Sequence, residues 1–342
     1  MKTAAAVYDR DGSISVRDMS IDGPGEGELL VRIDACGACS SEVMDWYMRA
    51  KAPVVLGHEP MGTVEECGPN VGGFGKGERV FVHHHAPCTA CRRCRRGDYV
   101  QCETWRSGKL VPGGMSQYAI VPAGIVRSDV LALPDWLSDD AATFVEPLAT
   151  VVKAVRRAGI KRGDRLLVIG LGVMGLLHVL LAEVHGAEVV IGCDPVASRR
   201  EKASSLGAQH VFRPDDVKEM TFAATSGEGA DVAIVGPGST AAMDQAAACV
   251  ARGGRIVLFA PLPPNERWPL PVNDFYFKDV QVITSYSAGP DDMREALRLL
   301  EGELPVEALV THRFGLRDAN DAYRLVRDAG EALKVIVYPN KS

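Results

Sequence analysis

The pattern of hydrophobic and polar positions changes near residue 146 of the chain. Before this point, short segments with a β-type pattern are separated by glycines, as in Glu28–Ile33, Gly62–Glu65 and Arg79–Val82. Short strands at such close spacing are typical of an antiparallel, barrel-like domain. We therefore expect residues 1–145 to form a domain of this kind.

From residue 146 onward the pattern becomes strand, helix, strand. Apolar segments bounded by turns predict six buried strands: Arg165–Ile169, Glu188–Cys193, His210–Phe212, Asp231–Val235, Arg255–Phe259 and Val280–Ser285. The clearest helical segments between them are Val173–His185, Ala197–Leu206 and Thr240–Val250. Strands joined through helices in this way form a doubly wound parallel sheet, which we expect over residues 146–285.

The last part of the chain mixes helices and strands again. It predicts a helix over Asp291–Leu300, a strand near Leu309–Phe314, a helix over Leu316–Asp328 and a final strand, Lys334–Tyr338. We expect residues 286–342 to complete the first domain. The fold class is then α/β with two domains.

Composition and charge narrow the class of protein. The 342 residues are 46% hydrophobic and 24% charged, which is an ordinary globular composition. A formal net charge of -6 argues against a nucleic-acid or anionic-membrane partner, because either would favour a basic surface. No signal peptide and no membrane-spanning stretch is predicted. Nine cysteines, four of them with metal-ligand spacing, fit a reducing cytoplasm better than a disulfide framework.

The four cysteines Cys88, Cys91, Cys94 and Cys102 are spaced C-x2-C-x2-C-x7-C. Four thiolates this close in sequence can surround one tetrahedral metal ion, and zinc is the usual occupant of a closed all-cysteine site. An iron–sulfur cluster is the alternative, but Cys102 lies too far along the chain for the bacterial ferredoxin spacing. The spacing therefore predicts a structural zinc lobe at about residues 88–102.

A glycine-rich turn follows the predicted strand Arg165–Ile169 and precedes an apolar helix. Its sequence is Gly170-Leu171-Gly172-Val173-Met174-Gly175. In a strand–turn–helix context these glycines permit a tight turn, close approach to a pyrophosphate and close packing of helix against strand. Asp194 ends the next strand, where a carboxylate accepts hydrogen bonds from the adenosine ribose and repels a 2′-phosphate. We therefore predict NAD rather than NADP, with Arg199 near enough to stack on adenine or to soften that preference.

A second set of metal-ligand residues lies outside the cysteine cluster. It consists of Cys39, His58, Glu59 and Glu146. One thiolate, one imidazole and one carboxylate leave a fourth position for water or substrate, as a catalytic zinc ion requires. His83-His84-His85 does not form such a set, because neighbouring side chains on a strand face opposite ways. For these three histidines we expect surface or cleft-lining roles.

Taken together, these motifs resemble one known family over essentially the whole chain. Gly57-His58-Glu59-Pro60, the four-cysteine lobe, Glu146-Pro147-Leu148 and the glycine turn occur in the order of zinc-dependent medium-chain dehydrogenases. Glu-Pro-Leu at the third ligand position resembles the sorbitol (polyol) and threonine dehydrogenase branch. The resemblance implies a GroES-like β-barrel catalytic domain and a Rossmann domain.

The resemblance also implies roles for individual residues. Cys39 and His58 would bind the catalytic zinc ion, with Glu59 or Glu146 as the third ligand, the two exchanging as water enters and leaves. Ser41 matches the first hydroxyl of the family's proton relay. Met44 stands where many relatives carry a histidine, so the relay is cut or rerouted through Asp45 or through water bound by Glu146.

The expected function is oxidation of a secondary alcohol on a polyol, sugar or (amino)cyclitol, with two zinc ions per chain and NAD. The alternatives are a reductase of a conjugated alkene or carbonyl and a threonine-type amino-alcohol dehydrogenase. The expected partners are a small hydroxylated substrate and further copies of the chain, in a homotetramer or homodimer.

Overall fold

The computed structural model describes residues 1–341. The chain divides into two compact units. The first comprises Met1–Ala149 and the segment from Ala288 to the last described residue, and the second comprises Thr150–Ser287. The boundaries predicted from the sequence lie at residues 145/146 and 285/286, within four residues of those observed.

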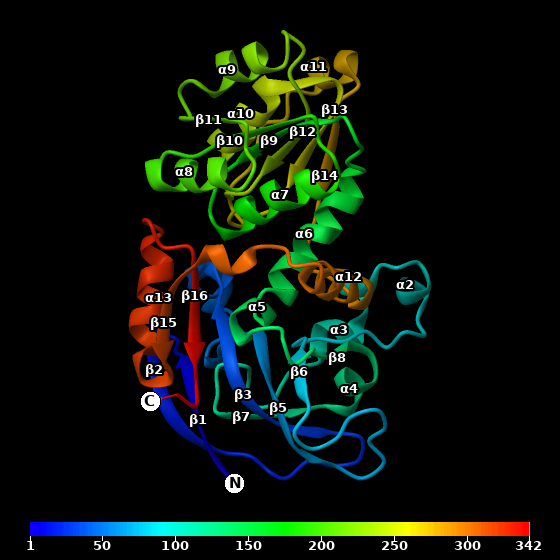
Figure 1. Ribbon diagram of the computed structural model, residues 1–342, viewed down its shortest axis with the longest axis vertical. Coiled ribbons are helices and arrows are strands. Elements are labelled where there is room, and N and C mark those ends of the chain that lie inside the picture. Colours follow the sequence, from blue (N-terminus) through cyan, green and yellow to red (C-terminus); the bar gives the residue numbers. More distant parts are fainter. Residues whose placement is uncertain (342) are drawn as a thin grey trace. The chain divides into compact units, whose positions relative to one another are not determined.

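Two sheets build the first unit (Figure 1). The smaller sheet has the order β2-β1-β4, and the larger has the order β15-β16-β3-β5-β6-β8, with β7 also paired to β3. The strands are β1 (Lys2–Tyr8), β2 (Ile14–Ser20), β3 (Leu29–Ala38), β4 (Val54–Val55), β5 (Glu59–Cys67), β6 (Arg79–Val82), β7 (Tyr118–Val121), β8 (Val130–Ala132), β15 (Val310–Gly315) and β16 (Lys334–Tyr338).

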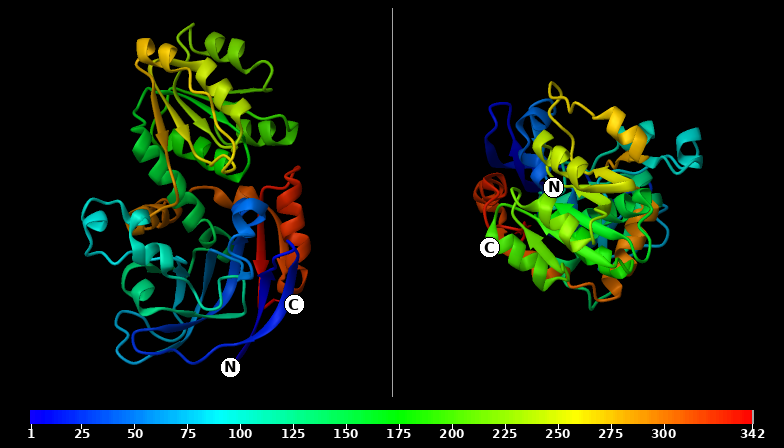
Figure 2. Two further views of the ribbon diagram at one scale, coloured as in Figure 1. Left: turned by 180° about the vertical axis from the view of Figure 1, so that it is seen from behind. Right: turned by 90° about the horizontal axis from the view of Figure 1, so that it is seen from above.

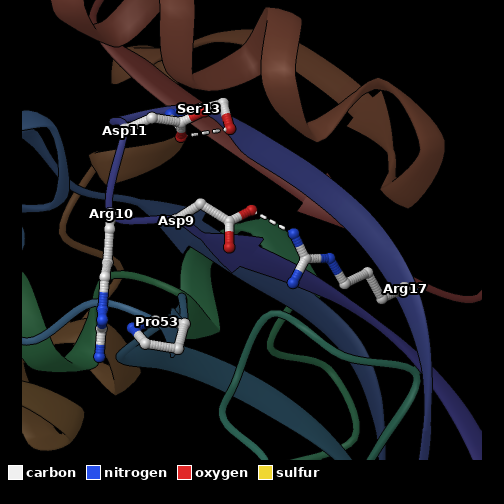
Figure 3. A pocket seen from close by; sticks show the side chains of 6 residues that line it. All are labelled: Asp9, Arg10, Asp11, Ser13, Arg17 and Pro53. Atoms are coloured by element: carbon white, nitrogen blue, oxygen red, sulfur yellow. Dashed lines mark hydrogen bonds and ion pairs between the residues drawn. The ribbon is translucent and has the colours of Figure 1, made fainter.

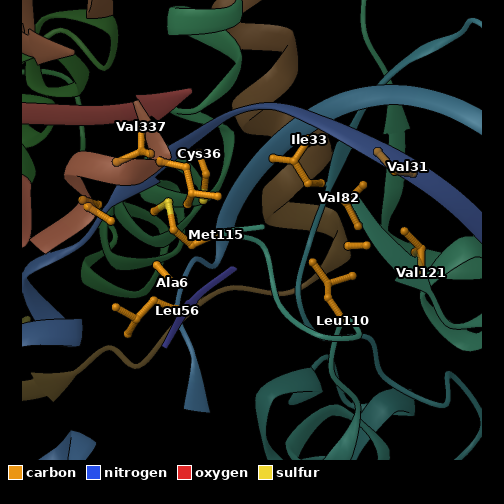
Figure 4. Packing of buried hydrophobic residues seen from close by; sticks show 14 of the residues in the cluster. Ala6, Val31, Ile33, Cys36, Leu56, Val82, Leu110, Met115, Val121 and Val337 are labelled. Atoms are coloured by element: carbon orange, nitrogen blue, oxygen red, sulfur yellow. The ribbon is translucent and has the colours of Figure 1, made fainter. Parts of the chain in front are cut away.

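β3 lies at the centre of the larger sheet and organises the core of the first unit. Val31 and Ile33 are buried, whereas Arg32 and Asp34 between and beyond them are partly exposed, which is the alternation expected of a strand. Val31 and Ile33 belong to a cluster that also contains Met115 (Figure 4). Packing in this core therefore holds the end of β3 in position, and with it the start of the loop that follows.

Short helices connect the strands of the first unit. They are η1 (Ser40–Val43), α1 (Asp45–Met48), α2 (Arg92–Arg95), η2 (Tyr99–Gln101), α3 (Glu103–Ser107), α4 (Ala123–Asp129), α5 (Asp139–Ala142), α12 (Pro290–Glu301), η3 (Val306–Leu309), η4 (Leu316–Asp318) and α13 (Ala319–Asp328). Helix α6 (Val145–Ala158) begins in this unit. The helices and strands predicted after residue 285 are all present within a few residues of the expected bounds.

The second unit is a parallel six-stranded sheet with the order β11-β10-β9-β12-β13-β14. All six predicted strands are confirmed: β9 (Arg165–Ile169), β10 (Val189–Cys193), β11 (His210–Phe212), β12 (Ala230–Val235), β13 (Val250–Leu258) and β14 (Gln281–Thr284). Helices lie on both faces of this sheet (Figure 2). They include α7 (Val173–Val184), α8 (Ala197–Ser205), α9 (Val217–Ala224), α10 (Thr240–Cys249) and α11 (Val272–Lys278).

The histidine run His83-His84-His85 differs from its expected place. Strand β6 ends at Val82, so the run does not continue the strand. His83 is fully buried rather than at a surface, and its backbone N–H donates to Asp129 O at 3.2 Å. Of the expected surface or cleft-lining roles, the surface role is wrong for His83, because its loop turns inward against Asp129 at the end of α4.

Candidate active site and metal centres

Strand pairing brings distant segments together at the end of β3. Gly37 pairs with Glu59 of β5, and Ala38 pairs with Val335 of β16. A Cβ at Gly37 would lie 1.8 Å from Glu59 Oε2 and 2.4 Å from Lys334 Nζ, so a larger residue here would displace both side chains. Cys39, which follows β3, therefore lies beside the first residue of β5.

Cys39, His58 and Glu59 form one of two groups of potential metal ligands in the described chain. Their Sγ, ring nitrogen and carboxylate oxygen all lie within 4.8 Å of one another. Cys39 and His58 are partly buried and Glu59 is buried. A thiolate, an imidazole and a carboxylate in one half-buried cluster are the donor set of an open zinc site, so these residues fit a catalytic zinc ion.

Glu42 fixes the orientation of His58. Its buried carboxylate accepts hydrogen bonds from Gly57 N at 2.6 Å and Tyr323 Oη at 2.6 Å, and its Oε1 lies 3.0 Å from His58 Nδ1. Burial by itself raises the pKa of Glu42, but His58 and the hydrogen bonds from Tyr323 and Gly57 together outweigh it, so the pKa is lowered. A carboxylate on the second nitrogen of a ligating histidine sets its tautomer and leaves the other nitrogen for the metal.

Lys334 is a buried residue of this region that the sequence did not single out. Its ammonium group forms an ion pair with Glu59 Oε2, lies 3.4 Å from Thr143 O and faces the ring of Phe144 at 4.9 Å. Both partners of the pair have 3% exposed side chains. The ion pair compensates the buried charge of Glu59.

Glu146 lies in the first turn of α6 and is 6% exposed. It is not part of the three-residue group around Cys39. Burial raises its pKa, and the charge of Glu59 adds to this, while His58, His83 and Lys334 act in the opposite direction. Glu59 is therefore the carboxylate that lies within the group in this structure, and Glu146 stays the alternative third ligand.

The residues expected to release the proton lie in two different environments. Ser41 Oγ donates to Cys39 Sγ at 3.3 Å, so the hydroxyl lies beside the group of ligands. Asp45 instead accepts a hydrogen bond from Tyr8 Oη at 3.0 Å and lies 3.6 Å from Arg49, with its side chain 56% exposed. Met44 links η1 to α1.

The four cysteines of the lobe also converge. Their Sγ atoms lie within 4.8 Å of one another, with 3.5 Å between Cys91 and Cys94 and 3.9 Å between Cys88 and Cys94. Sulfurs at the corners of a tetrahedron around zinc, with Zn–S bonds of about 2.3 Å, are about 3.8 Å apart. The separations fit a zinc site and are far too long for a disulfide bond.

Hydrogen bonds from backbone N–H groups stabilise thiolates in the lobe. The N–H groups of Cys88 and Cys91 donate to Cys102 Sγ and Cys88 Sγ, both at 3.4 Å. Burial tends to raise the pKa of Cys102, but hydrogen bonds from backbone N–H groups and from the thiols of Cys88 and Cys94 together outweigh it and lower the pKa to about 6. A small core of Cys94, Val100, Cys102 and Trp105 supports the lobe from within.

In the second unit the glycine turn has the geometry of a nucleotide site. Gly170 follows β9 with a φ of +87°, and a Cβ at Gly175 would lie 1.9 Å from Gly170 O. The turn leads into α7, whose first residues are Val173 and Met174. β9 lies between β10 and β12, where the strand order reverses, and this is where doubly wound sheets bind ligands.

Asp194 follows β10 and is 3% exposed. Its Oδ2 accepts from Leu171 N at 2.7 Å and its Oδ1 accepts from Val196 N at 2.8 Å, while Arg199 lies 3.9 Å away. An ionised carboxylate has about four acceptor positions, so two remain for a ribose diol. Asp194 thus braces the glycine turn and retains capacity for a ligand.

A pocket of about 500 Å³ lies at the turn between β1 and β2 (Figure 3). It is lined by Asp9, Arg10, Asp11, Ser13, Arg17 and Pro53. Asp9 pairs with Arg17, and Asp11 accepts from Ser13 N and Oγ at 2.9 and 2.7 Å. The lining includes none of the predicted site residues, and its carboxylates already have partners.

No helix in the described part of the chain has the length and apolar character to cross a membrane.

Comparison with known proteins assigns the chain to a family. A family model described as "Alcohol dehydrogenase GroES-like domain" matches residues 25–135, and one described as "Zinc-binding dehydrogenase" matches residues 173–302. The chain belongs to the zinc-dependent medium-chain dehydrogenases, and it is an oxidoreductase of the alcohol dehydrogenase type. The predicted fold class, a GroES-like domain with a Rossmann domain, is confirmed.

Individual relatives cover nearly the whole chain. L-threonine 3-dehydrogenase of Pyrococcus abyssi is 32% identical over 331 residues, which are 93% of each protein. Sorbitol dehydrogenase of Bacillus subtilis is 29% identical and covers 98% of this chain and 97% of its own. A structure from Sinorhizobium meliloti 1021 described as a zinc-binding dehydrogenase and bound to NADP is 30% identical, with a TM-score of 0.88 and coverage of 99% and 100%.

Proposed function

We propose that this protein oxidises a secondary alcohol on a polyol, sugar or (amino)cyclitol to a ketone, using one catalytic zinc ion and NAD. The convergence of Cys39, His58 and Glu59 within 4.8 Å carries this proposal. The similarity to a sorbitol dehydrogenase supports a hydroxylated substrate.

The roles follow from the donor atoms. Cys39, His58 and one of Glu59 and Glu146 hold the ion, which once bound acts as a Lewis acid and lowers the pKa of the substrate hydroxyl. Glu42 keeps His58 in the ligating tautomer. Lys334 neutralises Glu59 and restrains one of its two oxygens, which leaves the other oxygen or Glu146 for the ion.

The proton of the alcohol needs a carrier. Ser41 is the proposed first carrier, because its hydroxyl already lies against Cys39 Sγ. Asp45 is engaged with Tyr8 and Arg49, so water bound by Glu146 is the better candidate for the next step. Glu146 suits this role because burial raises its pKa and thus its affinity for a proton.

The second zinc ion is structural. A site closed by Cys88, Cys91, Cys94 and Cys102 has no open position, so it stabilises the lobe and performs no chemistry. Two zinc ions per chain follow from the two groups of ligands.

NAD is the proposed hydride acceptor, because the carboxylate of Asp194 repels a 2′-phosphate. Arg199, at 3.9 Å, weakens this repulsion. The NADP of the Sinorhizobium structure belongs to that protein, and the choice for this chain is tested below.

Further copies of the same chain are the proposed macromolecular partner, in a homodimer or homotetramer in the cytoplasm. Exposed large hydrophobic side chains gather within residues 270–286: Leu270, Val272, Tyr276, Phe277, Val282 and Tyr286. β14 is the last strand of its sheet and has no charged residue over Gln281–Thr284. An uncharged edge strand beside apolar side chains is the kind of surface that a second copy covers.

A panel of substrates tests the proposal against its alternatives. We expect zinc-loaded protein to form NADH with polyols or cyclitols, and more slowly or not at all with L-threonine. Reduction of an enone by NADH, without oxidation of any alcohol, would favour the reductase alternative. Threonine as the best substrate would favour the amino-alcohol alternative, which the Pyrococcus relative keeps open.

A further inference from the structure

The three consecutive histidines after β6 have unequal surroundings. His83 Nδ1 lies 2.6 Å from Asp129 Oδ2, and His85 Nδ1 lies 2.6 Å from Gly108 O. The rings of both also lie against Trp105, with centroids 6.3 and 4.4 Å away. His83 and His85 are therefore tied to the protein by hydrogen bonds and by packing against the lobe.

His84 is different. Its ring lies 5.2 Å from that of His58, and its Nδ1 is buried with no hydrogen-bond partner in the described part of the chain. The ring of His85 packs against it at a tilt of 48°, with ring centroids 3.9 Å apart, and restricts its orientation. Buried polar atoms nearly always have partners, so an unpartnered nitrogen next to a proposed zinc ligand suggests a partner that arrives with the substrate.

The chemistry of His84 selects that partner. Its ring lies among the rings of His58, His83 and His85, with centroid distances of 5.2, 5.1 and 3.9 Å. A neutral imidazole has one donor and one acceptor nitrogen, which suits a hydroxyl group. It offers no charge to a carboxylate or an ammonium group.

On the basis of the proposed alcohol dehydrogenase function, we propose that His84 is a substrate-binding residue that hydrogen-bonds a second hydroxyl, on the carbon next to the reacting one. A zinc ion held by His58 would bind the reacting hydroxyl, and a hydroxyl one carbon away would then lie near the ring of His84, whose centroid is 5.2 Å from that of His58. The site then favours vicinal diols and polyols over mono-alcohols.

Butane-2,3-diol and butan-2-ol test this as a matched pair, because they differ by one hydroxyl. We measure kcat/KM for each with NAD, and the dissociation constant of each by calorimetry on zinc-loaded protein, for wild type, His84→Phe and His84→Asn. Phe keeps an aromatic ring against His85 and His58, and Asn keeps a donor and an acceptor. His312→Phe is the control, because His312 is exposed.

Wild type should prefer the diol roughly tenfold, the value of one or two net hydrogen bonds. His84→Phe should remove this preference while butan-2-ol changes little, and His84→Asn should keep part of it. Equal affinity of wild type for both alcohols, or an equal loss of both in His84→Phe, would overturn the proposal. If neither alcohol is oxidised, the proposed function fails for this pair, but the calorimetric comparison still decides the role of His84.

Discussion

The ammonium group of Lys334 is paired with the carboxylate of Glu59, with both side chains almost completely buried. The two residues are 275 positions apart in the chain and meet because β16 and β5 both pair with β3. One of the proposed ligands of the catalytic ion is therefore held by the last strand of the protein.

Replacing Lys334 tests the importance of this pair. Lys334→Met should lower the free energy of unfolding of the metal-free protein by about 3–5 kcal/mol, because it leaves Glu59 buried without a counter-charge. Denaturant unfolding measures the change. Lys341→Met is the matched control, since Lys341 is 65% exposed and should contribute little. A Lys334 variant as stable as the control would show that the pair does not compensate Glu59.

The hydrogen bond from Tyr323 to Glu42 gives a second prediction. Tyr323→Phe removes one hydroxyl from a buried carboxylate, so it should cost about 1.5–3 kcal/mol of unfolding free energy. Glu42 would also hold His58 less firmly, so affinity for the catalytic zinc should fall. Zinc competition with a chelator measures this, with Tyr276→Phe, at a 78% exposed position, as control. Unchanged stability and zinc affinity would show that Tyr323 does not support Glu42 or, through it, His58.

These two contacts could not be predicted from the sequence. The strands of the second unit were predictable because each is a continuous apolar run bounded by turns, and the ligand motifs were predictable because each is local. Lys334 could be read only as a polar residue at the start of an apolar strand, and Tyr323 only as an aromatic residue on a helix. Their functions depend on contacts across the sheet and from α13, which no local pattern encodes. Helix α11 was missed for another reason: Phe275 is its one buried residue, so no amphipathic pattern marks it.

The cysteine lobe gives a third prediction. Cys91→Ser should lower the zinc content to about one ion per chain and reduce thermal stability, because a closed metal site contributes folding energy. Any effect on hydride transfer should be indirect. Metal analysis and a melting curve measure both changes, with Cys67→Ser, outside both groups of ligands, as control. Retention of two ions at full stability would refute the structural site.

Cofactor choice gives a fourth prediction. Wild type should prefer NAD to NADP. Asp194→Ala should reduce this preference, because it lowers the affinity for NAD. Because Asp194 also accepts from Leu171 N and Val196 N, the variant should lose some stability as well. Asp194→Asn removes the charge but keeps one acceptor oxygen, so one of the two N–H groups retains a partner and the loss of stability should be smaller than in Asp194→Ala. Equal use of both cofactors by the wild type would show that Asp194 does not discriminate.

The most direct test of the central claim is NADH formation from a polyol by protein that lacks the proposed catalytic ligands, measured beside its zinc content. The Cys39→Ser/His58→Ala double variant should keep the lobe zinc, bind about one ion per chain and show no alcohol oxidation, while wild type binds two ions and turns over. Ser41→Ala, which leaves the ligands in place, should keep both ions and retain reduced activity. Undiminished polyol oxidation by the double variant would contradict the proposed zinc-dependent mechanism.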